Sequence, residues 1–94
     1  MPSIQISPKA EDDLGEIWMA IALDNPSAAD RMLKRIGAAI ERLARFPESG
    51  APREDIARGA RMLVEGAYLV LYEITADDVT VVRVVHGARD LRRL

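Results

Sequence analysis

Two helix-start signals lie close together near the beginning of the chain, and they restrict how it can fold. Ser7-Pro8 places a capping hydroxyl before a proline at the first helical position, and apolar residues then recur at helical spacing as far as Ala22. Pro26 opens a second helical pattern a few residues later, and this pattern continues to Phe46. Two helices joined by so short a link must lie antiparallel. The sequence therefore predicts a helical hairpin.

Apolar stretches on both sides of the predicted hairpin indicate strands. The first is residues 3–7, and after a loop over residues 48–59 the others are residues 61–65, 67–74 and 79–86. Residues 67–74 are apolar on both faces for most of their length, so this strand should be central in a three-strand meander. We therefore expect an α+β fold with an N-terminal strand, an antiparallel helical hairpin packed on a β-sheet meander, and a short C-terminal tail. Residues 1–94 should form a single domain.

Composition and charge exclude several classes of function. The 94 residues include no cysteine, so disulfides and thiolate metal sites are excluded. The formal net charge is −2 and the sequence pI is about 5.3, which leaves no overall attraction to nucleic acid. No apolar run approaches the roughly 20 residues that a bilayer-spanning helix needs. We therefore expect a cytoplasmic protein with no membrane association and no sequence-specific nucleic-acid binding of its own.

One stretch of the first predicted helix is apolar on all sides. Every residue from Ile17 to Leu23 is apolar, and Met19 and Leu23 point away from the stripe that contains Ile17. A helix that is apolar all round needs cover on two sides. The meander and the loop could supply that cover, or the extra face could be a patch on which a partner docks. Methionine suits such a patch because its flexible side chain adapts to different partner surfaces.

Few side chains are candidates for catalysis. His86 is the only histidine, so we expect neither a metal site nor a cofactor. The carboxylate pairs Asp12-Asp13 and Asp77-Asp78 occupy a helix start and a turn, where structure alone explains them. The sequence contains no recognisable combination of a nucleophile and a base, and we expect no catalytic residue.

A metal-free nuclease is the one enzymatic interpretation of His86. The imidazole would act as the base, and Arg61, Arg83 and Arg89 would bind the phosphate. A second proton-transfer group is hard to identify. Most small proteins that cut RNA without a metal carry a strongly basic surface, whereas this chain has 13 basic and 15 acidic residues.

The C-terminal segment is cationic on an otherwise acidic chain. From Arg83 to Leu94 there are four arginines and one aspartate, a charge of +3. A cationic extension of this kind is more easily interpreted as a contact surface than as a catalytic centre. Alternatively, Leu91 and Leu94 pin the tail to the sheet, and the arginines only keep it solvated.

Several segments together resemble one family of small bacterial proteins. These are residues 7–14 (SPKAEDDL) with Ile17-Trp18, then Ala44-Arg45-Phe46-Pro47 with Gly50, then Arg61 with residues 66–72 (GAYLVLY), and finally residues 82–90 (VRVVHGARD). In this order and spacing they are similar to the ParE branch of the RelE/ParE toxin superfamily, whose members are the toxic halves of type II toxin–antitoxin operons. The likeness runs essentially end to end, and it implies the same fold that the patterns predict.

The resemblance also implies a function. The RelE branch cuts ribosome-bound messenger RNA, whereas the ParE branch inhibits DNA gyrase without being a nuclease. This chain has no tyrosine beyond Tyr72 and no lysine beyond Lys34, so the nuclease residues of the RelE branch do not carry over. The resemblance therefore implies a gyrase inhibitor, not an enzyme, which a ParD-type ribbon-helix-helix antitoxin neutralises in a heterotetramer or larger complex. A RelE-like nuclease and a non-toxic binding module are the alternatives.

The same resemblance assigns candidate residues to the two partners. The antitoxin would bind the extra apolar face and nearby basic side chains, namely Trp18, Met19, Leu23, Arg31, Met32, Lys34, Arg35 and Arg61. The target, gyrase or the DNA that it holds, would bind the last strand and the cationic tail, namely Arg83, His86, Arg89, Arg92 and Arg93.

Overall fold

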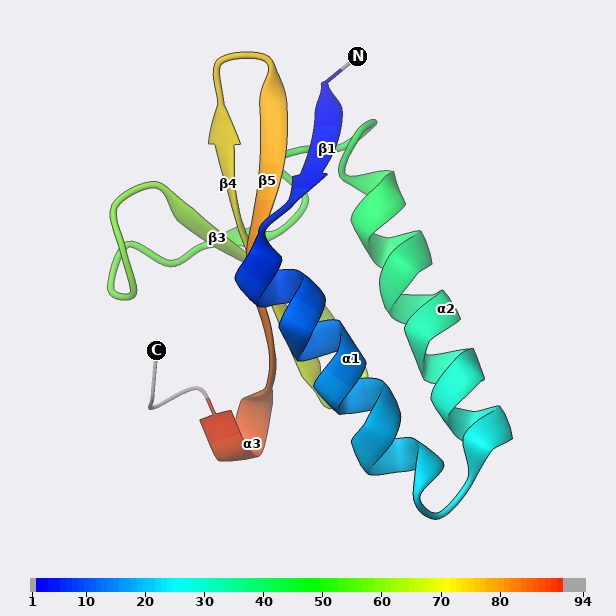
Figure 1. Ribbon diagram of the computed structural model, residues 1–94. Helices are drawn as coiled ribbons and strands as arrows, with labels where there is room; N and C mark the ends of the chain where they lie inside the picture. The colour runs from blue at the N-terminus through cyan, green and yellow to red at the C-terminus, as the bar shows by residue number, and fades with distance from the viewer. Residues whose placement is uncertain (1, 91–94) are drawn as a thin grey trace.

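The computed structural model describes residues 2–90, in which two long helices pack on one face of a five-stranded sheet (Figure 1). The elements in chain order are β1 (Ser3–Ile6), α1 (Pro8–Ala22), α2 (Pro26–Arg42), β2 (Ala51–Pro52), β3 (Ala60–Glu65), β4 (Tyr68–Thr75), β5 (Asp78–His86) and α3 (Gly87–Asp90). The predicted α+β fold is therefore confirmed.

The helical hairpin begins each helix with the same local device. Ser7 Oγ accepts a hydrogen bond from the N–H of Ala10 at 3.0 Å, and Asn25 Oδ1 accepts one from the N–H of Ala28 at 3.0 Å. Each cap is followed by proline at the first helical position, where no N–H is missed. The two helices run antiparallel, as the short link predicted (Figure 1).

The sheet has the strand order β1-β5-β4-β3-β2. The predicted meander is present as β3, β4 and β5, which pair antiparallel with β4 between its neighbours. Two further pairings were not predicted: β1 lies parallel to β5, with Ile4 opposite Val79, and β2 adds a short strand beside β3. Both lie at an edge of the sheet, so the predicted central position of β4 holds.

The second helix ends earlier than its apolar spacing predicted. α2 stops at Arg42, and the N–H groups of Leu43 and Ala44 bond to carbonyls three residues back, which tightens the chain into turns. Phe46 precedes Pro47, and a residue before proline disfavours the helical conformation. Phe46 therefore leaves the helical stripe and is exposed to solvent.

The core lies between the helices and one face of the sheet. Its largest fully buried side chains are Tyr72, Ile36, Leu43, Val70, Val79, Val81 and Val84. Tyr68 and Tyr72 both fill this interior, as expected for two tyrosines on one strand. One side of α1 is exposed to solvent, and a cavity opens beside the C-terminal end of β5; the candidate sites lie at these two places.

Candidate functional site

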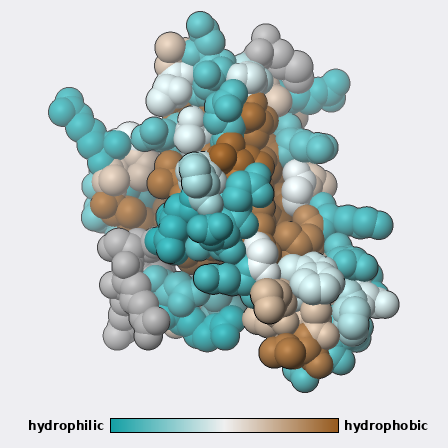
Figure 2. Space-filling view, viewed as in Figure 1, coloured by the Kyte–Doolittle hydropathy of each residue, from teal (hydrophilic) through white to brown (hydrophobic). Residues whose placement is uncertain are grey.

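The extra apolar face predicted on α1 is exposed. Trp18, Met19 and Leu23 are 40%, 65% and 88% exposed, whereas Ile17 is buried in the core. Figure 2 shows apolar side chains at the end of the hairpin where α1 turns into α2. We call Trp18, Met19 and Leu23 the α1 apolar face. Within residues 2–90, neither the meander nor the loop covers this face, so it is available to a partner.

Trp18 is oriented by a contact between the two helices. Its indole Nε1–H donates to Asp30 Oδ1 on α2 over 2.9 Å. This bond holds one edge of the ring and leaves much of the rest in solvent. An aromatic side chain that is already ordered loses little entropy when a partner covers it, and tryptophan is enriched at binding hot spots.

The predicted antitoxin-binding residues of α2 fall into two groups. Arg31 and Lys34 are exposed. Arg35 instead pairs with Glu65 at the end of β3, with Nη2 2.9 Å from Oε2. Met32 is partly buried and packs against the core. Arg31, Lys34 and Arg35 are therefore all exposed, but Arg35, whose side chain is 54% exposed, also joins α2 to the sheet together with Met32.

Arg61 is engaged within the protein. Its Nε donates to the carbonyl oxygen of Gly50 at 3.0 Å, and its Nη2 donates to the carbonyl oxygen of Glu48 at 2.9 Å. The guanidinium group thereby joins the loop after α2 to β3. An antitoxin contact through Arg61 stays a prediction, since these bonds already give the residue a structural role.

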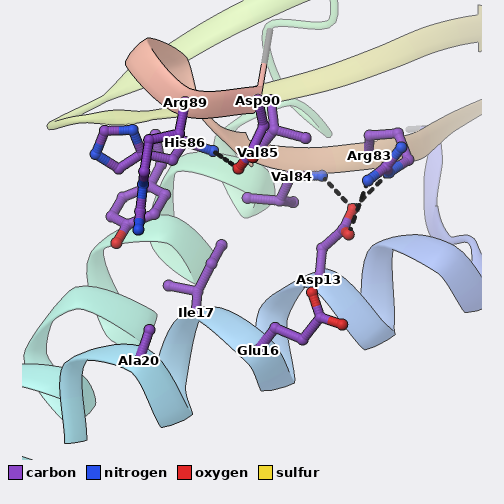
Figure 3. A pocket seen from close by; sticks show the side chains of 11 residues that line it. Asp13, Glu16, Ile17, Ala20, Arg83, Val84, Val85, His86, Arg89 and Asp90 are labelled. Carbon is purple, nitrogen blue, oxygen red and sulfur yellow. Dashed lines mark hydrogen bonds and ion pairs between the residues drawn. The ribbon is translucent and has the colours of Figure 1, made fainter. Parts of the chain in front are cut away.

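Three of the predicted target-binding residues line one cavity. Arg83, His86 and Arg89 surround a volume of about 630 Å³ between α1, the end of β5 and α3 (Figure 3). We call this cavity the Arg83–His86 pocket. Its other lining residues are Asp13, Glu16, Ile17, Ala20, Tyr68, Val84, Val85 and Asp90. Two further predicted residues, Arg92 and Arg93, lie outside the described residues.

The pocket contains an ion pair that was not predicted from the sequence. Asp13 Oδ2 accepts from Arg83 Nε at 2.8 Å and from the N–H of Val84 at 3.0 Å, and Asp13 Oδ1 accepts from Arg83 Nη2 at 3.1 Å (Figure 3). The Asp13 side chain is buried. The hydrogen bond that Arg83 donates to Asp13 raises the pKa of Arg83. Burial opposes this effect, and the negative charges of Asp13, Asp90 and Glu16 reinforce it. The place of Asp13 at a helix start therefore does not by itself explain this residue, because its carboxylate also binds Arg83 and Val84.

A β-bulge brings Arg83 to α1. The pairing of β4 with β5 shifts so that Val82 is an extra residue in β5. Ser7 Oγ donates to the carbonyl oxygen of Val82 over 2.8 Å, and Asp13 accepts the N–H of Val84. These two side chains bond to the edge of β5 that β1 no longer reaches. Residues from the start of α1 therefore complete the strand edge and position Arg83.

His86 has a packing role at the end of β5. Its ring meets Tyr68 edge to face, with centroids 5.5 Å apart and an interplanar angle of 86°. Its Nδ1 is buried and has no hydrogen-bond partner among residues 2–90. The N–H of His86 donates to Asp90 Oδ2 at 3.2 Å, which joins α3 to the strand. The structure thus adds Asp90 to the predicted group.

The charges around the pocket leave an excess of acid. Three carboxylates and two guanidinium groups line it, which gives a net charge of −1 with His86 neutral. One of the carboxylates, Asp13, is also bound directly to Arg83. A phosphate group in this pocket would therefore meet more negative than positive charge. The pocket better suits a cationic or hydrogen-bonding group of a partner than a nucleic-acid backbone.

Residues 2–90 contain neither a metal-binding cluster nor a membrane-spanning helix. In this range, no three His, Cys, Asp or Glu side chains gather closely enough to hold a metal ion. None of the helices in the same range is both long enough and apolar enough to cross a bilayer.

The same fold occurs in a solved structure. A solved chain described as "Chromosomal ParDE TA system from P. aeruginosa" matches it with a TM-score of 0.80, covering 92% of this chain and 96% of that chain at 21% identity. At the sequence level, residues 4–91 match the family model described as the ParE toxin of type II toxin-antitoxin system, parDE. The chain belongs to the ParE toxin family.

Named relatives agree with this assignment. The chain is 32% identical to toxin ParE1 of Mycobacterium tuberculosis over 90 residues, which cover 94% of this chain and 92% of the relative. It is 30% identical to toxin ParE3 of Caulobacter vibrioides over 80 residues, which cover 84% and 80% of the two chains. The family resemblance carried by the sequence motifs is therefore confirmed.

Proposed function

We propose that this chain is a toxin that inhibits DNA gyrase, blocks replication and is neutralised by a ParD-type antitoxin. The family match over residues 4–91 carries the proposal. We propose further that the toxin acts in the cytoplasm by binding other macromolecules and catalyses no reaction itself. The acid excess of the Arg83–His86 pocket supports this second point, because a nuclease needs a site that attracts phosphate.

The α1 apolar face is the proposed antitoxin site. It offers three large apolar side chains, and its tryptophan is already oriented by Asp30. An amphipathic helix of the antitoxin would bury these side chains, and acidic residues beside that helix would pair with Arg31 and Lys34. Such an arrangement combines an apolar centre with a charged rim, which is the usual composition of a specific protein interface.

Met19→Glu tests the antitoxin site. Because Met19 is exposed in the isolated toxin, the substitution should leave folding unchanged, but in the complex it would bury an unpaired carboxylate. We expect the affinity for the antitoxin to fall about 30-fold or more, which corresponds to about 2 kcal/mol. Val64→Glu is the matched control, since Val64 is an exposed apolar residue of similar accessibility on β3. Unchanged affinity of Met19→Glu, measured by calorimetry, would place the antitoxin elsewhere.

The Arg83–His86 pocket and the residues that follow it are the proposed target site. Arg89 is exposed at the edge of the pocket. We expect the purified chain to inhibit supercoiling by gyrase, and the triple variant Arg89→Ala, Arg92→Ala and Arg93→Ala to inhibit it at least tenfold less at an unchanged melting temperature. Arg45→Ala with Arg58→Ala removes exposed arginines elsewhere and serves as the control. Normal supercoiling at high toxin concentration would refute gyrase as the target.

A ribonuclease is the second candidate function, because of one observation. The pocket brings His86 together with Glu16 and Asp90, so groups that could exchange a second proton are present after all. Incubation of the chain with translating ribosomes separates the two proposals. Cleavage of messenger RNA that is lost in His86→Gln would establish the nuclease, whereas intact messages together with inhibited gyrase would support the first proposal.

A further inference from the structure

The sheet extends beyond the helices at one end of the molecule. The side chains of Tyr68, Val70 and Tyr72 form one row of β4 that faces the helices, and all three are buried. Ile74 is the next residue in this row, yet it is 40% exposed. It pairs with Val79 near the β4–β5 turn, and because Val79 is fully buried, the cover over the core ends between these two residues. The end of the core is therefore open to solvent.

The loop that follows α2 partly fills this opening, and it is held rigidly. Tyr72 Oη donates to the carbonyl oxygen of Pro47 at 2.7 Å and accepts from the N–H of Gly50 at 2.9 Å. Arg61 adds its two bonds to the loop carbonyls. This loop presents Phe46, which is 60% exposed, to solvent. A partner would therefore not have to order the loop before binding to it.

Two hollows lie side by side on this part of the surface, and Pro47 and Ile74 line both of them. Their volumes are about 540 Å³ and about 410 Å³. We define the Phe46–Ile74 surface by the lining residues Phe46, Pro47, Glu48, Ile74, Ala76 and Asp77. It lies where the β4–β5 hairpin turns, at the opposite end of the molecule from the α1–α2 turn that carries Leu23 (Figure 1). It is therefore separate from the α1 apolar face.

We propose that the Phe46–Ile74 surface binds a segment of a partner protein in which a large apolar side chain lies beside lysine or arginine. The apolar part of the surface would bind the large apolar side chain. Its two charged lining residues, Glu48 and Asp77, are both acidic and exposed, and they would pair with the lysine or arginine of the partner. Arg45 precedes Phe46 but lines neither hollow. This site is additional to the antitoxin and target sites and does not depend on them.

Synthetic peptides test the proposed chemistry on the full-length chain. The probe has a central leucine flanked by lysines; one control has glutamates in place of the lysines, and another has serine in place of the leucine. Binding is followed by amide chemical shifts of the ¹⁵N-labelled protein. We expect the lysine–leucine peptide to shift the amides of Glu48, Ser49, Ala76 and Asp77, and to bind at least tenfold more tightly than either control peptide.

Variants of the protein complete the test. Ile74→Asp should weaken the lysine–leucine peptide at least tenfold, whereas Val82→Asp, at an equally exposed valine on the next strand, should not. Phe46→Ser gives a second disruption at an exposed loop position, in case Ile74→Asp unfolds the chain. Glu48→Lys with Asp77→Lys should reverse the preference toward the glutamate peptide. Equal binding of the lysine and glutamate peptides, shifts centred elsewhere, or no shifts at about 1 mM peptide would each overturn the proposal.

Discussion

The ion pair between Asp13 and Arg83 allows a quantitative prediction about stability. Asp13→Ala removes three hydrogen bonds and leaves the buried N–H of Val84 without an acceptor. An orphaned buried amide costs about 1–3 kcal/mol. Loss of the carboxylate beside Arg83 adds about 1 kcal/mol, a reduced value because that side chain, 29% exposed, recovers part of its hydration. We therefore expect the free energy of unfolding to fall by about 3 kcal/mol.

Asp13→Asn separates the two contributions. The asparagine carbonyl can still accept the N–H of Val84, but it offers no charge to Arg83. The cost should therefore be only about 1–2 kcal/mol, and the difference between the two variants measures the bond to Val84. Asp12→Asn is the matched control: Asp12 is the exposed neighbour on the same turn, and its replacement should change stability by less than about 0.5 kcal/mol.

Urea denaturation followed by circular dichroism measures these differences, and thermal melts check them. For a domain of this size, a loss of about 3 kcal/mol lowers the melting temperature by about 12–24 °C. The pKa of Arg83 is raised from an already high value. The contribution of Arg83 to the free energy of unfolding is therefore fully present below its unfolded-state pKa, and we expect it to be constant from about pH 6 to 9. A loss below about 1 kcal/mol for Asp13→Ala would show that the amide of Val84 needs no carboxylate.

Three further changes should alter stability in defined directions, measured in the same urea assay. Gly50→Ala would place a Cβ 2.7 Å from the Tyr72 ring and 2.8 Å from the carbonyl oxygen of Met62. We therefore expect the free energy of unfolding to fall by about 2 kcal/mol or more. An unchanged free energy would mean that the loop moves aside. Tyr72→Phe removes the partner of Pro47 and Gly50 and should cost about 1–3 kcal/mol, unless water replaces the hydroxyl. Ala76→Gly relieves a φ of 25° in the β4–β5 turn and should stabilise the protein by about 1 kcal/mol, and a loss of stability would contradict the strain.

The features that were predicted correctly depend on neighbours in the sequence. The helix starts need only a capping side chain and a proline within the same turn, so Ser7-Pro8 was sufficient to place α1. Short links determine which elements can lie antiparallel, and this placed both the hairpin and the meander. The exposure of Met19 and Leu23 was predicted from the unbroken run of apolar residues in the first helix, because a small chain cannot cover every side of an apolar helix.

The features that were missed depend on residues far apart in the chain. Asp13 and Arg83 are 70 residues apart, and nothing near Asp13 identifies its partner. One signal was present, since Asp13 lies one turn from both Ala10 and Ile17 and so belongs to the buried side of α1. Phe46 fitted the periodicity of α2, but the end of a helix is decided by the turn before Pro47, which periodicity does not detect. The Phe46–Ile74 surface was therefore also missed.

The pairing of the first strand with the last has a consequence for protein synthesis. β1 leaves the ribosome long before its partner strand, which begins only at Asp78, opposite Ser3. Until that strand emerges, Ile4 and Ile6 have nothing to pair with, and the start of α1 has no strand edge to bind. A nascent chain that ends before Asp78 cannot pair β1 with β5, so the five-stranded sheet is completed only after β5 has been synthesised.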